Sequence, residues 1–228
     1  MSIVPFVSFV FPRLTIAILL TCATALPLAA QTRRASSDPA DVPAVSFKPF
    51  FLATTEQLAA QQTFEAVFGQ SREPFWGGGV QVALRNGIYV EISASRFRKT
   101  GQRAFVFNGQ TFPLGIPLTA TITPLELTGG YRFRLWPMVI PYAGIGISRY
   151  GYVETSDLAD AADNVDTAHL GYLVVGGAEF RVHRWVGVGV DVQYTRVTGI
   201  LGGGGISAEL GENDLGGTAL RLKVMVGR

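Results

Sequence analysis

The chain has 228 residues, of which 48% are hydrophobic, 27 are glycine and only 16% are charged. This length suits one large all-β domain, and the formal net charge of +2 gives no electrostatic basis for binding nucleic acid. Beyond the N-terminal segment no run of about 18 apolar residues occurs, so we expect no membrane-spanning helix there.

The N-terminal segment has the pattern of a secretory signal peptide. Arg13 precedes the apolar run Leu14–Leu20, small residues follow as far as Ala30, and the sequence then turns polar. We therefore predict a cleaved signal peptide at residues 1–30, with Ala25 as a second cleavage position. Removing it takes away one arginine and no acid, which leaves a net charge of +1.

The single cysteine, Cys22, lies inside this segment. The exported chain then has no thiol for a disulfide or a thiolate-bound metal, while lipidation of Cys22 is a less favoured alternative. A polar lead-in follows at residues 31–44, and the predicted β-barrel domain covers residues 45–228.

Eight segments have the composition and alternation of strands. The predicted strands are Val45–Leu52, Trp76–Arg85, Ile88–Phe97, Leu118–Phe133, Val139–Tyr152, Ala168–Val182, Trp185–Val197 and Gly216–Val226. Pro49, Pro124 and Pro141 fall inside them, and each removes a ladder hydrogen bond, so the strand boundaries and register near these prolines are left open.

Long and short connections alternate between these strands. The short ones are Asn86-Gly87, Arg134–Met138 and His183-Arg184, and the long ones are Ala53–Phe75, Arg98–Pro117, Val153–Thr167 and Thr198–Leu215. An antiparallel up-and-down transmembrane β-barrel with short turns at one end and long loops at the other has this pattern. We therefore predict an eight-stranded barrel of this kind.

Strand Trp185–Val197 separates its residues by parity. Val186, Val188 and Val190 alternate with Gly187, Gly189 and Asp191, so one face is apolar and the other small or charged. The same reading of all strands predicts a mixed-sign charge network in the interior, formed by Lys48, Arg85, Glu91, Glu126, Arg132, Glu179, Arg181, Asp191, Arg221 and Lys223. It also predicts aromatic girdles at the two membrane interfaces, formed by Trp76, Trp136 and Trp185.

Three segments resemble those of a known group of proteins: Leu127–Phe133, Pro141–Gly146 and Gly176–Arg181. They resemble strands of the small eight-stranded outer-membrane β-barrels, the group of the OmpA transmembrane domain, OmpX, OmpW and the opacity proteins. The resemblance implies residence in the bacterial outer membrane, with outer-membrane lipid and lipopolysaccharide as surroundings. It implies no catalytic residue.

Three connections carry features that leave alternatives open. Between Thr55 and Gly69, apolar residues near helical spacing predict a short amphipathic helix that caps the barrel or lies on the membrane, with ordinary loop packing as the rival reading. Arg96, Arg98, Lys99 and Arg103 suit lipid phosphates or simply solvent. The connection 153–167 carries acids, which favours a solvated loop over a cation site or receptor surface.

The two histidines, His169 and His183, are expected to be solvated residues at the rim of the barrel, and no serine forms a recognisable pair with either of them. We predict a monomer without catalytic residues, cofactor or metal, with a structural or surface-interaction role carried by its long loops.

Two alternatives remain for the function. One is passage of a small apolar solute, which resemblance to OmpW implies. The other is a soluble periplasmic ligand-binding barrel with the apolar parity turned inward.

Overall fold

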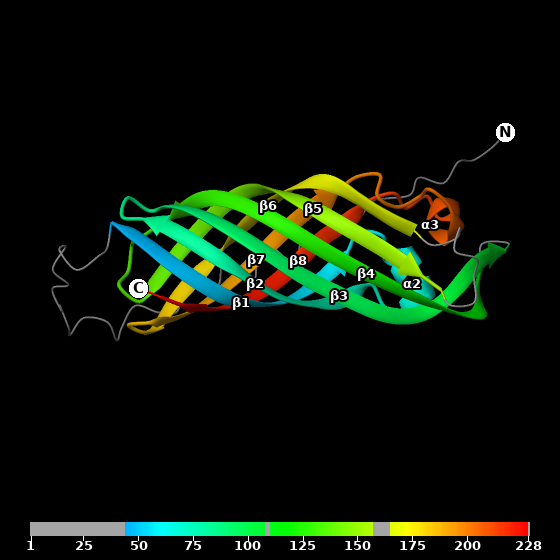
Figure 1. Ribbon diagram of the computed structural model, residues 1–228, viewed down its shortest axis with the longest axis horizontal. Helices are drawn as coiled ribbons and strands as arrows, with labels where there is room; N and C mark the ends of the chain where they lie inside the picture. Colours follow the sequence, from blue (N-terminus) through cyan, green and yellow to red (C-terminus); the bar gives the residue numbers. More distant parts are fainter. Residues whose placement is uncertain (1–43, 108–109, 157–164, 228) are drawn as a thin grey trace, which may run out of the picture. The chain divides into compact units, whose positions relative to one another are not determined.

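The computed structural model describes residues 44–107, 110–156 and 165–227, and in them the chain forms a closed antiparallel barrel with strand order β1 to β8 (Figure 1). The strands are β1 (Val45–Leu58), β2 (Arg72–Leu84), β3 (Ile88–Phe107), β4 (Gln110–Arg132), β5 (Val139–Thr155), β6 (Val165–His183), β7 (Val186–Val197) and β8 (Leu215–Val226). Two short helices, α2 (Gln61–Phe68) and α3 (Gly205–Glu209), lie at the end with the longer loops. The predicted fold class is confirmed.

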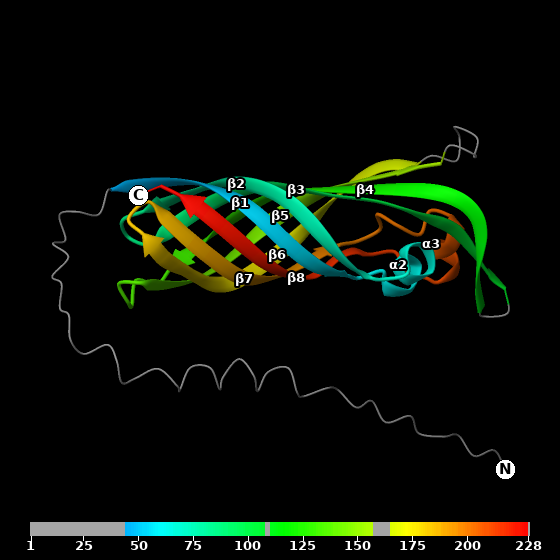
Figure 2. The ribbon, with the colours of Figure 1, turned by 90° about the horizontal axis from the view of Figure 1, so that it is seen from below.

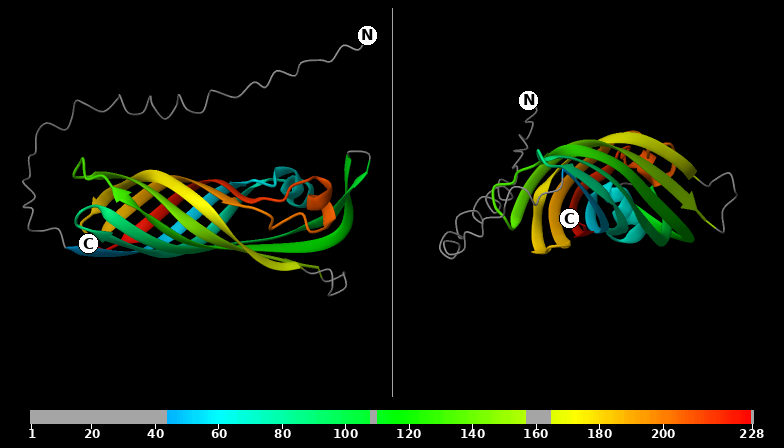
Figure 3. Two further views of the ribbon diagram at one scale, coloured as in Figure 1. Left: turned by 90° about the horizontal axis from the view of Figure 1, so that it is seen from above. Right: turned by 60° about the vertical axis from the view of Figure 1, so that its left-hand side comes forward.

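The register of the strands gives the barrel its tilt. A path along paired residues from Lys48 once around the barrel returns to β1 at Leu58, ten residues further on. A stagger of this kind forces the strands of a closed barrel to slope by about 35–45° against the axis. Figure 3 shows this slope along the wall of the barrel.

The apolar parity of the strands faces outward. On β7, Val190 and Val192 are 41% and 46% exposed, whereas the intervening Asp191 is 1% exposed. With a rise of about 3.3 Å per residue and this tilt, the outward apolar residues form a band about 25 Å tall, as in transmembrane barrels. A soluble barrel with an apolar interior would have the opposite arrangement.

The prolines lie where a ladder is interrupted or ends, which explains why strands pass through them. Pro124 lies opposite the stretch of β3 between Ala94 and Phe97 for which no residue pairs with β4. Pro141 lies beyond the last pair of β5 with β4, and Pro49 precedes the first pair of β1 with β8. Their missing N–H groups therefore remove little from the sheet.

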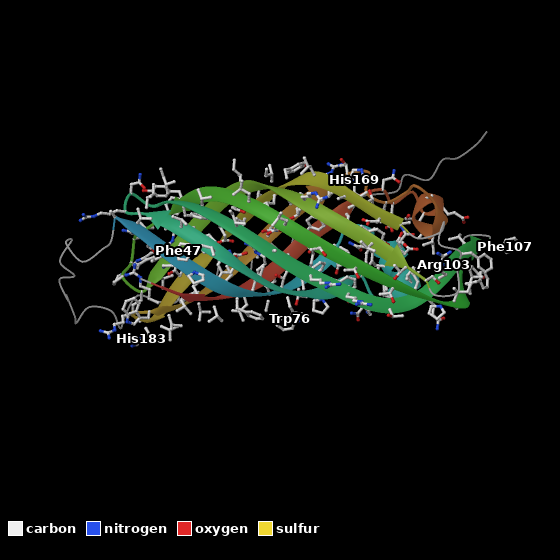
Figure 4. The ribbon with its side chains drawn as sticks, in the orientation of Figure 1. Phe47, Trp76, Arg103, Phe107, His169 and His183 are labelled. Carbon is white, nitrogen blue, oxygen red and sulfur yellow. The ribbon has the colours of Figure 1, made fainter. Side chains whose placement is uncertain are left out.

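The prediction that residues Arg98–Pro117 form a loop is wrong. Strand β3 continues to Phe107 and β4 begins at Gln110, so this connection is a hairpin that extends beyond the barrel mouth (Figure 2). Its alternating aromatic and aliphatic residues pair across the hairpin, as Phe105 and Phe112 do with ring centroids 5.5 Å apart. Phe107 lies at its far end (Figure 4). The first long connection is also shorter than predicted, because β1 extends to Leu58 and β2 begins at Arg72.

The short connections fall within one residue of their predicted bounds, with β6 ending at His183 and β7 beginning at Val186. Gly87 adopts a φ of +98° in the Asn86-Gly87 turn, a conformation that favours glycine. The described helices include none long and apolar enough to span a membrane. The predicted signal peptide at residues 1–30 and most of the acidic connection, residues 157–164, lie outside the described residues.

Candidate functional site: the barrel interior and its mouth

The middle of the barrel holds a network of buried charges centred on Arg221. Its guanidinium donates from Nε to Asp191 (2.5 Å) and from Nη1 to Glu126 (3.1 Å). Lys223 lies beside it and donates to Glu91 (2.6 Å). All five side chains are buried, and further donors such as Tyr142 and Gln193 reach the same carboxylates. Satisfying each carboxylate several times is what makes buried charges tolerable.

A second cluster lies nearer the short-turn end. Glu179 accepts hydrogen bonds from Lys48 (2.5 Å) and from Arg132, and all three are at most 7% exposed. Across the two clusters the charges balance, with four bases against four acids. These two clusters therefore place many charged groups in the interior without adding a net charge of their own.

Eight of the ten residues predicted for the interior network are buried in these two clusters. Arg85 and Arg181 are not, because both are exposed at the short-turn end. Strand β2 ends at Leu84, so Arg85 already belongs to the turn, and the β6–β7 register shifts between Arg181 and His183. Parity no longer determines the direction of a side chain at such positions.

Several of these interactions cross the lumen. In a ring of eight strands, β4 lies opposite β8 and β1 lies opposite β5. Arg221 of β8 reaches Glu126 of β4, and Tyr150 of β5 donates to Glu56 of β1 (3.2 Å). Side chains from opposite walls thus meet near the axis, and they fill the interior as expected for a barrel of eight strands.

The interior becomes mainly apolar at the loop end, although the buried carboxylates of Glu56 and Glu73 lie beside its apolar cluster. We call it the mouth cluster: Leu58, Ala60, Phe64, Phe75, Phe97, Ala120, Ile122, Tyr150, Tyr152, Val197, Ile200 and Leu215. Sequence reasoning missed it because it expected polar residues along the whole inner parity. The available signal was the inward position of Phe97 and Ile122 on the same parity as Glu91 and Glu126.

Helix α2 covers the mouth cluster, which confirms the predicted amphipathic helix. Phe64 is 1% exposed, and its ring centroid lies 5.5 Å from that of Phe68. The Phe68 ring in turn contacts the ring of Phe97 edge-on. A Cβ on Gly101 would overlap the carbonyl oxygen of Val67, so glycine on β3 permits the close approach of the helix. The helix therefore lies against the inner wall of the mouth rather than on the outside of the barrel.

Glu212, from the last long loop, holds the first turn of α2. Its two carboxylate oxygens accept hydrogen bonds from the backbone N–H groups of Gln62 (3.1 Å) and Thr63 (2.8 Å). A carboxylate satisfies the free N–H groups of a helix N-terminus and complements its dipole. Lys99 links β3 to β2 and to the helix, since it donates a hydrogen bond to buried Glu73 of β2 (2.8 Å) and lies over the Phe68 ring of α2.

The histidines lie toward opposite ends of the barrel (Figure 4). His169 Nδ1 is 3.4 Å from Thr167 Oγ1, and Ser207 donates to the Gly204 carbonyl within its own loop. Neither contact forms a nucleophile–base pair. Within the part of the chain that the structure describes, no cluster of three or more His, Cys, Asp or Glu side chains has the geometry for a metal.

The three tryptophans lie on the outside. Trp76 is 59% exposed on β2 (Figure 4). Its ring lies beside that of Phe51, with the two ring centroids 6.1 Å apart. Trp136 and Trp185 are 57% and 45% exposed at the short-turn end, where Arg184 lies over the Trp185 ring. They thus occupy both limits of the outward apolar band.

Comparison with known proteins yields a likeness of fold. No protein-family model and no curated protein matches the sequence. The structure is similar to that of Ail, the attachment invasion locus protein of Yersinia pestis, solved with the heparin analogue sucrose octasulfate (TM-score 0.52, 10% identity, 82% of this chain and 100% of Ail). It also resembles Neisserial surface protein A (0.47, 12%, 81% and 97%) and the N-terminal β-barrel domain of Pseudomonas aeruginosa OprF (0.47, 10%, 80% and 97%). The chain has the fold of the small eight-stranded outer-membrane barrels.

Proposed function

We propose that this protein is a monomeric, non-enzymatic barrel of the bacterial outer membrane, with a closed interior and a structural or surface-interaction role at its loop end. The outward apolar band supports membrane residence, and the predicted signal peptide supports export. The fold is that of outer-membrane barrels, and the short turns are assigned to the periplasmic side because that arrangement is general among them.

The observation that carries this proposal is the set of interactions across the lumen. The Arg221–Glu126 pair joins opposite walls in the middle, the Lys48–Glu179 pair lies below it, and the mouth cluster closes the loop end. A hydrated ion would have to displace all three layers. Activity is therefore assigned to the surface that the loops and the β3–β4 hairpin present, rather than to transport.

Conductance in a planar lipid bilayer tests the closed interior. We expect the wild-type protein to insert without discrete open levels. A variant with both Glu126 and Arg221 replaced by alanine removes the crossing pair and serves as the comparison. Discrete wild-type openings like those of the double variant would contradict the closed interior and assign the protein to transport.

The mouth cluster favours one second candidate, the passage of a small apolar solute. An apolar molecule could occupy this part of the lumen only if α2 moved away from Phe97 and Ile122. Entry would then lead to the charged layers, so the solute would have to leave sideways through the wall. Uptake of an apolar dye by vesicles that contain the protein, above the rate of protein-free vesicles, would favour this candidate.

A further inference from the structure

Four exposed arginines point outward just beyond the apolar band at the loop end. They are Arg72 on β2, Arg96 and Arg98 on β3, and Arg149 on β5, and we call them the arginine patch. Along each strand these arginines come after the outward apolar residues in the direction of the loops; on β5, for example, Arg149 is the next outward residue after Ile147. The patch thus begins where the proposed lipid-facing surface ends.

The register brings these arginines together on one side of the barrel. Arg96 pairs with Trp76 of β2, Arg98 pairs with Thr121 of β4, and Leu125 of β4 pairs with Arg149. With a rise of about 3.3 Å per residue and a tilt of about 40°, the four arginines lie within about 7 Å of one another along the axis. Strand β4 runs between them and contributes the outward Thr121 and Thr123.

The acids on these four strands do not neutralise the patch. Glu73, Glu91 and Glu126 point inward and are at most 6% exposed, and Glu154 accepts a hydrogen bond from the inward Tyr152. Among the described residues, none of the four arginines forms an ion pair or hydrogen bond with a side chain. On the other side of the barrel, by contrast, Arg196 is paired with Asp214 at 3.3 Å.

Uncompensated guanidinium groups at this level match one chemistry. Arginine binds phosphate with two parallel hydrogen bonds, and its weakly hydrated fork suits an interface with a hydrocarbon layer below. Continuity with the apolar band identifies the source of the phosphate as lipid, because a headgroup lies at this height when its acyl chains lie against the band.

We propose that the arginine patch binds the phosphate groups of an anionic lipid in the leaflet at the loop end, with Thr121 and Thr123 as neighbouring hydroxyl partners. This inference rests on the proposed membrane residence and names the partner of that surface. It modifies the sequence-based cluster: Arg96 and Arg98 belong to the patch, while Lys99 points inward to Glu73.

The test compares lipid retention by matched variants of the full chain. In the patch variant all four arginines become glutamine; the control makes the same change in net charge at the short-turn end, by glutamine at Arg85, Arg134, Arg181 and Arg184. Each protein is refolded into nanodiscs of phosphatidylcholine, alone or mixed with lipopolysaccharide, and extracted with mild detergent. Lipopolysaccharide that copurifies is then measured by its phosphate.

We expect the wild type and the control to retain lipopolysaccharide, and the patch variant to retain at least about tenfold less. Inorganic phosphate added at extraction should leave the amount of lipopolysaccharide retained by the wild type unchanged. If phosphate displaces the lipopolysaccharide, the ligand of the patch is a free anion and not a lipid. Equal retention by the patch variant and the wild type would overturn the proposal. Heat-dependent gel mobility in phosphatidylcholine separates the two ideas, since a protein that never inserts there contradicts membrane residence itself.

Discussion

Replacing Arg221 by methionine should destabilise the barrel strongly. Methionine fills a similar volume but removes the only guanidinium described in the central network, where Arg221 reaches Asp191 at 2.5 Å, Glu126 at 3.1 Å and Glu91 at 3.7 Å. Lys223 then remains as the nearby base for three buried carboxylates. The change leaves buried charge uncompensated without making a large cavity.

The size of the effect follows from the burial of the site. Arg221 is 2% exposed, and removing one partner from a buried ion pair typically costs about 3–5 kcal/mol. Such a cost corresponds to a change of about a hundredfold or more in the unfolding equilibrium constant. The same substitution at the exposed Arg149 should cost less than about 0.5 kcal/mol in a neutral detergent.

Urea unfolding in zwitterionic detergent, followed by tryptophan fluorescence and by heat-dependent gel mobility, measures both variants. A double variant, Arg221→Met with Glu126→Met, tests the electrostatic cause. Because it removes one acid together with the base, we expect its free energy of unfolding to fall by less than the sum of the two single changes. Equal stability of Arg221→Met and Arg149→Met, or additive effects in the double variant, would refute the reasoning.

Four further predictions concern the barrel wall, helix α2 and the topology. Gly189→Trp should lower the urea midpoint, because a large ring would enter a space already occupied by Met225, Lys223 and Tyr142. Val190→Trp should fold with nearly wild-type stability in lipid, and the reverse order would invert the inside and outside assignments. Val190→Arg should cost about 2–4 kcal/mol in lipid vesicles, since Val190 lies near the middle of the apolar band. Glu212→Gln should speed proteolysis within α2 without changing the gel mobility of the barrel, because it weakens the hold on the first helical turn; unchanged cleavage would show that apolar packing alone holds the helix. Protease added to intact cells should cut within residues 198–215 and spare residues 134–138, and cleavage at the latter would mean inverted topology.

Local patterns in the sequence were sufficient to predict the strands that form the closed wall of the barrel. The alternation around Asp191 predicts which face of β7 is buried because successive strand side chains point to opposite sides. The Asn86-Gly87 turn has its predicted place because its conformation depends on the residues in the turn itself. The same reasoning placed eight of ten charged residues in the interior and failed at Arg85 and Arg181, where the regular strand ends or shifts.

Parity predicts that a side chain points inward, but it does not predict how far along the barrel axis the side chain lies. The mouth cluster was therefore not predicted. Phe97 and Glu91 share a parity on β3, yet Phe97 meets α2 while Glu91 meets Lys223. The extension of β3 to Phe107 was not predicted, because closure of the barrel sets no length for a hairpin that continues beyond its mouth.

Closure of the barrel decided the partners. Lys48 and Glu179 are separated by 131 positions along the chain, and Arg221 and Glu126 by 95. Composition and alternation could show that these charges share an interior, since both properties are local. Which charges meet across it depends on the stagger around all eight strands, and this stagger is defined only when the last strand pairs with the first. The same stagger brings Arg72, Arg96, Arg98 and Arg149 to one level on the outside.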